Sequence, residues 1–314
     1  MSADNNEADE ETSRCASCGV AENDDIKLKK CTACHLVRYC GVKCQKEHRP
    51  KHQKECRKRA AELHDELLFK QPESSHYGDC PICLIPLPLD PEKAGLSPCC
   101  SKLVCIGCDY ANVKRKIEDG LAHECPLCRQ LAPNSQDEAN RMMMKRIEAN
   151  DPDALRQWGN LSDKKGDHKR AFKYWTKAAE LGDAVAHYDL SCMYRDGEGV
   201  EKDEKKEVYH LGQAAIGGNP DARINLGVIE WNNGQYERAV KHFIIAANLG
   251  DVDSMQRVKK LYRAGYVSKE DFASTLRAHH AAVDAMKSPH RELAAADVGY
   301  CEFMKKFVNG CDAK

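Results

Sequence analysis

Residues 80–128 read CPICLIPLPLDPEKAGLSPCCSKLVCIGCDYANVKRKIEDGLAHECPLC and contain eight cysteines in four pairs. Three pairs have the spacing C-x-x-C, which places two thiolates about one zinc ion apart, and two pairs complete a tetrahedral site. The gaps of fifteen and sixteen residues between pairs predict two interleaved sites that close one small domain. The first site would join Cys80, Cys83, Cys105 and Cys108, and the second Cys99, Cys100, Cys125 and Cys128.

This stretch is expected to need metal to fold, because about fifty residues bury too little apolar surface to form a stable domain without it. Structural zinc contributes roughly 10–16 kcal/mol in small zinc-finger peptides. The residues CPIC (80–83), CCSKLVCIGC (99–108) and CPLCR (125–129) resemble a RING finger. Lys102 stands where that family often has a histidine ligand, so the stretch looks like the all-cysteine variant. His123 remains an alternative ligand to one cysteine of the Cys99-Cys100 pair.

A second cluster of metal ligands precedes the first, at residues 15–56. Its spacing is C-x2-C, C-x2-C, C-x3-C and H-x3-C, and the last two spacings suit ligands one helical turn apart. RYCGVKCQKEHRPKHQKEC (38–56) resembles the MYND zinc finger closely. The resemblance implies one zinc ion held by Cys15, Cys18, Cys40 and Cys44, and another held by Cys31, Cys34, His52 and Cys56. His48 is a rival to His52 with a less suitable spacing.

The MYND-like finger departs from its family at one position that matters for binding. The family uses a glutamine and, four residues later, a tryptophan to grip proline-rich peptides; here these positions are Gln45 and Arg49. Residues 43–59 are rich in Lys, Arg and His and could contact nucleic-acid phosphates. Glu47 and Glu55 interrupt this run and no aromatic residues follow it, which favours a solvated helix. Nucleic acid is therefore not an expected partner.

From residue 151 the chain repeats with offsets of 32, 36 and 32 residues. Small residues recur in one helix, large residues recur four positions later, and Gly-Asp or Gly-Asn pairs end each unit. The first column is Ala154, Ala186, Ala222 and Ser254; the second is Trp158, Leu190, Leu226 and Val258; the third is Trp175, Leu211 and Phe243. These patterns predict a stack of helical hairpins. KAAELGDAVAHYDLSCMYRDGEGVEKD (177–203) resembles the Sel-one-like subclass of tetratricopeptide repeats.

The predicted fold is mainly α, with two small cross-braced zinc fingers followed by an α-solenoid of helical hairpin repeats. The predicted domains are a disordered acidic tail (1–12), a MYND-type finger (13–58), a helical linker (59–76), a RING-type finger (77–131), a linker (132–150), Sel-one-like repeats (151–287) and a C-terminal capping helix (288–314). Within the second linker, Met142 to Met144 are expected to cover the end of the array.

Composition excludes several classes of protein. The chain has 314 residues, with 48 Lys+Arg against 49 Asp+Glu, so no global charge indicates nucleic acid or membrane. No apolar run approaches the ~20 residues that span a bilayer. The N-terminus, MSADNNEADEE, is acidic and lacks the apolar core of a secretion signal. Eighteen cysteines in such a chain indicate metal binding rather than disulfides, and the expected compartment is the cytoplasm or the nucleus.

No catalytic constellation is visible in the sequence, so any enzymatic role rests on the RING-like finger. That resemblance implies a ubiquitin ligase, which holds a charged conjugating enzyme in reactive geometry. The matching contact positions are Ile82, Pro126 and Arg129. The alternative is a non-catalytic adaptor, which the absence of a tryptophan between Cys108 and Cys125 favours. In either case we expect four zinc ions, and protein partners held by the repeats and the MYND-like finger.

Overall fold

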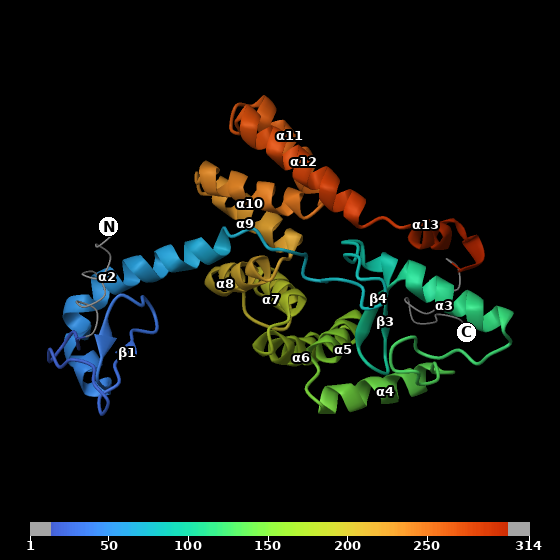
Figure 1. Cartoon of the computed structure of the whole chain (residues 1–314), viewed down its shortest axis with the longest axis horizontal. Helices are drawn as coiled ribbons and strands as arrows, with labels where there is room; N and C mark the ends of the chain where they lie inside the picture. Colours follow the sequence, from blue (N-terminus) through green and yellow to red (C-terminus); the bar gives the residue numbers. More distant parts are fainter. Residues whose placement is uncertain (1–13, 301–314) are drawn as a thin grey trace, which may run out of the picture. The chain divides into compact units, whose positions relative to one another are not determined.

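The computed structural model describes residues 14–300, and the chain divides into two compact units, residues 1–70 and 71–314 (Figure 1). The predicted acidic tail and the end of the predicted capping helix lie outside the described residues. The first unit holds a two-stranded sheet and one long helix. These elements are β1 (Lys29–Lys30), β2 (Arg38–Tyr39) and α2 (Val42–Leu68). The strands pair antiparallel, Lys29 opposite Tyr39, and turn the chain back toward the first turn of α2.

The second unit begins with a small finger built on one hairpin and one helix. Its elements are the short 3-10 helix η2 (Pro91–Lys93), β3 (Ala94–Ser97), β4 (Lys102–Cys105) and α3 (Ile106–Glu118). The strands pair antiparallel, and β4 runs directly into α3. Leu87 and Val104 form the centre of a small core with Cys80 and Cys105. With so few apolar residues inside, the finger depends on its cysteines for stability.

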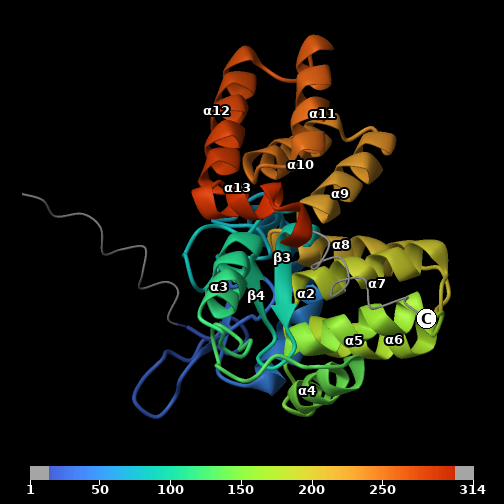
Figure 2. The ribbon, with the colours of Figure 1, turned by 90° about the vertical axis from the view of Figure 1, so that its right-hand side faces the viewer.

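A series of helical hairpins makes up most of the rest of the second unit, and it rises from α4 at the bottom to α11 and α12 at the top of both views (Figures 1 and 2). The helices are α4 (Gln136–Glu148), α5 (Pro152–Lys164), α6 (His168–Glu180), α7 (Ala184–Asp196), α8 (Glu204–Ile216), α9 (Pro220–Asn232), α10 (Tyr236–Asn248), α11 (Val252–Arg263), α12 (Lys269–Ala285) and α13 (Pro289–Ala296). The mainly helical fold predicted from the sequence is confirmed. No helix in residues 14–300 is both long and apolar enough to cross a membrane.

The turns between hairpins have the predicted chemistry. Gly182, Gly218 and Gly250 have φ angles of +89°, +84° and +93°, a left-handed conformation that glycine adopts without strain. The residue after each glycine caps the next helix: the side-chain oxygens of Asp183, Asn219 and Asp251 accept from the N–H groups of Ala186, Ala222 and Ser254 at 2.7, 3.0 and 2.6 Å. Only three residues therefore separate the end of one helix from the start of the next at each of these turns.

The repeated columns form the core of the array. The small column Ala154, Ala186, Ala222 and Ser254 is fully buried, and Leu190, Leu226 and Val258 are at most 3% exposed. Two glycines that the sequence analysis did not single out explain the third column. A Cβ on Gly159 would lie 2.5 Å from the Trp175 ring, and one on Gly227 would lie 2.7 Å from the Phe243 ring. Each large ring therefore packs directly on the backbone of the preceding helix.

Three of the predicted segment boundaries differ from the structure. The helical linker ends early, because α2 stops at Leu68 and residues 71–79 form neither helix nor strand. The segment 132–150 is mostly helix α4, where Met142 and Met143 are buried beside α5. The last predicted helix is broken, since α13 ends at Ala296 and Asp297 has an extended backbone.

The finger and the array belong to one compact unit, and two segments join them. The first is residues 71–79, which pass along the ends of the array helices. The Gln71 amide donates to the carbonyl of Ile245 at 3.4 Å, and the His76 N–H donates to the carbonyl of Gly218 at 3.2 Å. A Cβ on Gly218 would lie 2.8 Å from the Ser74 carbonyl oxygen, so glycine is needed at this crossing.

The second joining segment is α13, which lies beside α3 in both views of the ribbon (Figures 1 and 2). A Cβ on Gly107 of α3 would lie 2.7 Å from the backbone nitrogen of Arg291, so the two helices touch at their backbones. The hydroxyl of Tyr110 donates to Asp297 at 3.1 Å, and the rings of Tyr110 and Tyr300 meet edge to face. The end of the repeat region is thereby fastened to the finger.

Candidate metal centres

The same tight turn surrounds four of the cysteine pairs. In each C-x-x-C pair of this kind, the residue after the second cysteine has a positive φ, and its N–H donates to the carbonyl of the first cysteine. These residues are Gly19, His35, Leu84 and Arg129, with φ angles of +73°, +59°, +58° and +59° and N···O distances of 2.8, 3.0, 2.8 and 2.9 Å. Three of the four are not glycine, and such backbones persist where the surroundings fix them.

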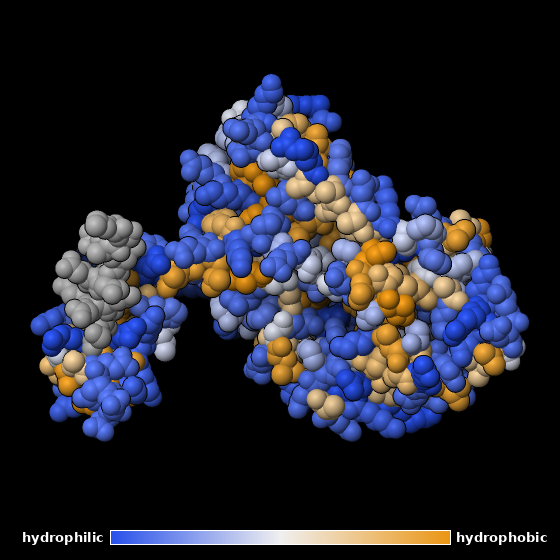
Figure 3. All heavy atoms as spheres, in the orientation of Figure 1, coloured by the Kyte–Doolittle hydropathy of each residue, from blue (hydrophilic) through white to orange (hydrophobic). Residues whose placement is uncertain are grey.

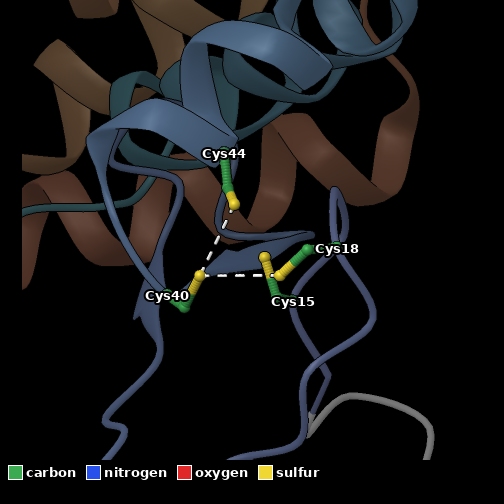
Figure 4. A group of neighbouring side chains, drawn as sticks. All are labelled: Cys15, Cys18, Cys40 and Cys44. Carbon is green, nitrogen blue, oxygen red and sulfur yellow. Dashed lines mark hydrogen bonds between the residues drawn. The ribbon is translucent and has the colours of Figure 1, made fainter.

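The first centre joins two parts of the first finger (Figure 4). Cys15 and Cys18 come from the N-terminal turn, Cys40 precedes α2 and Cys44 lies in the first turn of α2. The sulfur of Cys18 lies 3.7 Å from that of Cys40, which lies 3.5 Å from that of Cys44. All four ligand atoms lie within 4.8 Å of one another.

The second centre is held by Cys31, Cys34, His52 and Cys56, whose ligand atoms also lie within 4.8 Å of one another. The Cys31 and Cys56 sulfurs are 3.7 Å apart, and His52 Nε2 lies 3.1 Å from the Cys34 sulfur. His52 and Cys56 are one turn apart on α2. His48, the rival in the sequence analysis, lies outside this group: its Nδ1 is 3.1 Å from the Tyr39 hydroxyl, and its ring stacks on His52.

The RING-like finger holds two further groups of four, and they are interleaved. Cys80 and Cys83 lie with Cys105 and Cys108, and Cys99 and Cys100 lie with Cys125 and Cys128. Sulfur distances are 3.8 Å for Cys83–Cys105, 3.8 Å for Cys100–Cys125 and 3.3 Å for Cys128–Cys99. His123 is not in the group; its carbonyl accepts from the Ala132 N–H at 2.8 Å. The structure thus brings together both cysteines of the Cys99-Cys100 pair.

In each of the four tight turns described above, the first cysteine has a lowered pKa. Burial opposes the thiolate of Cys15, but backbone N–H groups, that of Cys18 foremost, donate to its sulfur and lower its pKa to about 6. The same balance of burial and backbone donors lowers the pKa of Cys31 to about 6 and those of Cys80 and Cys125 to about 7. A thiolate is the form of cysteine that binds metal.

Other cysteines of these groups have raised pKa values, because several sulfur atoms lie close together. The Cys40 thiol donates to the sulfur of Cys44, and this contact, followed by those with Cys18 and Cys15, raises the pKa of Cys40 to about 12. Burial, and then the neighbouring sulfurs, raise the pKa of Cys56 to about 12 and that of Cys100 to about 11. A bound divalent cation would reverse this effect, because it favours the thiolate form of every ligand. The electrostatics of each group therefore suit a cation at its centre.

The donor sets and distances fit zinc. Tetrahedral Zn–S bonds of about 2.3 Å place sulfur atoms about 3.8 Å apart, close to most of the separations above. The cysteines are free thiols in the structure, with no disulfide among the described residues. Each group supplies four protein ligands, which leaves no position for water or substrate. Zinc held in this way would stabilise the fold and would not act on a substrate.

The three proposed ligase contacts lie on the RING-like finger at different depths. Ile82 is 41% exposed, Pro126 is half-buried and Arg129 is exposed. Leu84, beside Ile82, is 75% exposed. Hydrophobic side chains gather on the visible face over β3, β4 and the first turn of α3 (Figure 3). Arg129 also occupies the left-handed position of its turn, a role that the sequence analysis did not assign.

Arg291 is the important residue near these centres that the sequence analysis missed. Its buried guanidinium donates to the carbonyls of Pro86 and Met286 at 2.7 Å each and to that of Ile85 at 3.1 Å. It also lies 3.8 Å from the sulfur of Cys83. The contact joins residues 205 positions apart, so no local pattern could have indicated it.

The geometry defines a zinc-finger protein with an α-solenoid, and comparisons with known proteins identify two of its modules. Residues 15–56 match the family model of the MYND finger, and residues 155–183, 184–219 and 220–251 match that of the Sel1 repeat. Neither match includes residues 77–131. The MYND and Sel-one-like assignments are therefore confirmed, whereas the RING resemblance stays a prediction. MYND fingers bind zinc, and both families are generally protein-interaction modules.

Two solved structures have a weak similarity to parts of this chain. A Sel1 repeat protein from Oxalobacter formigenes has 24% sequence identity and a TM-score of 0.40, over 55% of this chain and 79% of that one. A protective antigen of uropathogenic Escherichia coli strains, described as displaying an SLR fold, has 18% identity and a TM-score of 0.39, over 58% of this chain and 38% of that one. No curated protein matches the chain.

Proposed function

We propose that this chain is a zinc-stabilised scaffold that brings several protein partners together on one chain. The MYND finger and the repeats supply two binding surfaces, and four zinc ions hold the two fingers in shape. The observation that carries this proposal is the joining of the RING-like finger to the array by Arg291 and by residues 71–79. Partners bound to the RING-like finger and to the array would keep one fixed geometry within the second unit, and the MYND finger, a separate unit, would bring its own partner to the same chain.

The scaffold predicts that its two binding surfaces act separately. Cys31→Ser removes one ligand of the MYND finger, and Gly227→Leu forces a side chain into Phe243 of the array. Quantitative proximity labelling in cells should lose one set of neighbouring proteins with the first variant and another set with the second. Arg277→Met, at an exposed position on α12, serves as the control. Neighbour sets that are identical for wild type and both variants would contradict the scaffold.

A ubiquitin ligase is the second candidate, and the exposed apolar pair Ile82 and Leu84 favours it. In this reading the pair would contact a conjugating enzyme, and Arg129 would bridge that enzyme to ubiquitin through its guanidinium fork. Tyr110 lies between Cys108 and Cys125 but is committed to Asp297 and Tyr300, so it does not replace the missing tryptophan. The repeats would then recruit the substrate, and the fixed unit would position it.

A ubiquitination assay separates the two candidates. Wild type, Ile82→Ala and Arg129→Ala are each assayed for ubiquitin transfer with a broad panel of conjugating enzymes, and the three proteins are matched in zinc content. If the chain is a ligase, the wild type transfers ubiquitin and both variants lose this transfer. Absence of transfer by the wild type leaves the scaffold, and equal transfer by all three proteins rules out this contact mechanism. Because Arg129 has a positive φ, Arg129→Gly is included as a second variant that relieves backbone strain.

A further inference from the structure

A groove lies between helices α9, α10 and α11 near one end of the array. It has a volume of about 300 Å³ and is lined by Val228, Trp231, Phe243, Arg257, Lys260 and Leu261. Its floor is rigid, because the Phe243 ring rests on the backbone of Gly227 and belongs to the core cluster with Val258. A groove with a fixed floor is already formed before a ligand binds.

One end of this groove carries exposed aromatic rings. Trp231 meets Tyr236 and Tyr266 edge to face, with ring centroids 4.7 and 4.9 Å apart. The two tyrosines are 43% and 48% exposed, and Val228 is 37% exposed. Aromatic residues in this setting offer large apolar contact area at low conformational cost, which is typical of binding surfaces.

The charged residues of the groove all have one sign. Arg257 and Lys260 line it, and no acidic residue does. Arg257 lies over the Phe243 ring at 5.7 Å, and no carboxylate pairs with either cation among residues 14–300. Two unpaired cations beside an apolar floor attract a ligand with acidic groups next to an apolar side chain.

We propose that this groove binds a short acidic peptide segment of a partner protein, with one large apolar side chain inserted between α9 and α11. The volume is at the small end of ligand sites, so it admits one anchor side chain and leaves the flanking residues on the surface. Asp or Glu residues beside the anchor contact Arg257 and Lys260, and the tyrosines cover the exposed side of the anchor. The inference rests on the proposed role of the repeats as a protein-binding surface.

The test is a selection of random peptides displayed on phage against the full-length, zinc-loaded protein. Peptides with an aromatic or aliphatic residue flanked by Asp or Glu should be enriched. The affinity of the most enriched peptide is then measured by fluorescence anisotropy. Arg257→Glu combined with Lys260→Glu should weaken it at least tenfold. Lys259→Glu, an exposed change on the same helix but outside the groove, should alter it less than twofold.

Each other outcome overturns the proposal. If the enriched peptides lack acidic residues, or if the double charge reversal does not change their affinity, the groove is not an acidic-peptide site. The array would still be a binding surface in that case. A selection that yields no specific peptide contradicts the binding role of the array as well. Self-association of the protein that the double reversal abolishes, measured by sedimentation, would show that a second copy occupies the groove instead.

Discussion

Replacing Arg291 by Met should loosen the RING-like finger from the array. Methionine keeps much of the apolar stem but removes the guanidinium, which donates to three carbonyls at 2.7, 2.7 and 3.1 Å. Two of these carbonyls, those of Ile85 and Pro86, belong to the finger, and that of Met286 lies between α12 and α13. A single change therefore cuts the bonds at the point where the two parts join.

The size of the effect follows from the number of bonds. At about 1 kcal/mol net for each hydrogen bond, three bonds contribute about 3 kcal/mol. Removing the guanidinium also leaves buried carbonyls without their donor. The decrease in the free energy of unfolding should therefore lie at the upper end of the range for single substitutions. With an m value near 3 kcal/mol/M, the midpoint of urea unfolding should fall by about 1 M.

Two signals separate the finger from the array during unfolding. The three tryptophans, Trp158, Trp175 and Trp231, all lie in the array, so their fluorescence follows the array. A chromogenic chelator follows the release of zinc. In Arg291→Met the zinc of the RING-like finger should be released earlier, and the fluorescence transition should move with it. The control Arg277→Met changes an exposed residue on α12, and its free energy of unfolding should stay within about 0.5 kcal/mol of that of wild type. An Arg291→Met transition that coincides with that of the control would refute the clamp.

Three further predictions concern the metal, the crossing segment and pH. Metal analysis of the reduced protein should give four zinc ions per chain, and two or fewer would exclude the two-finger arrangement. Gly218→Ala should destabilise the protein more than Gly234→Ala, because both positions have a positive φ but only Gly218 is crossed by Ser74. An alanine in the left-handed conformation costs about 1–2 kcal/mol at either position. Equal decreases in the thermal unfolding temperature of the two variants would argue against the crossing. Burial, and the charge of Arg156 after it, lower the pKa of His76 to about 4, so the folded form resists protonation and loses stability as the pH falls from about 6.5 to 4. The stability advantage of wild type over His76→Gln should shrink by about 3 kcal/mol over this range, and a difference independent of pH would contradict the burial of His76.

The sequence predicted the repeats well because their determinants are local and recur. Gly182 stops a helix and Asp183 starts the next by backbone geometry and capping, and neither needs a distant partner. The buried columns follow from helical periodicity in the same way. The glycines that accept the rings of Trp175 and Phe243 were missed because their role depends on a neighbouring helix.

The grouping of cysteines in the RING-like finger followed from their spacing and order, and that in the first finger followed from the MYND resemblance. Spacing favoured His52 over His48, and the structure agrees: His52 lies in the ligand group, whereas His48 lies beside the Tyr39 hydroxyl. The joining of the finger to the array was not predictable. It depends on Arg291 and residues 71–79 meeting partners that lie more than a hundred residues away along the chain.

The contact between Pro86 and Arg291 also sets the order of events during synthesis of the chain. The two residues are 205 positions apart, and ribosomes add about 5–20 residues per second, so the finger emerges roughly 10–40 s before its clamp exists. Throughout that interval α13 is absent and the array is still being synthesised, and the finger's own core is small. Early capture of the zinc ions predicted for this finger would then keep it folded, and a shortage of zinc would expose this segment to chaperones and proteases before the array could protect it.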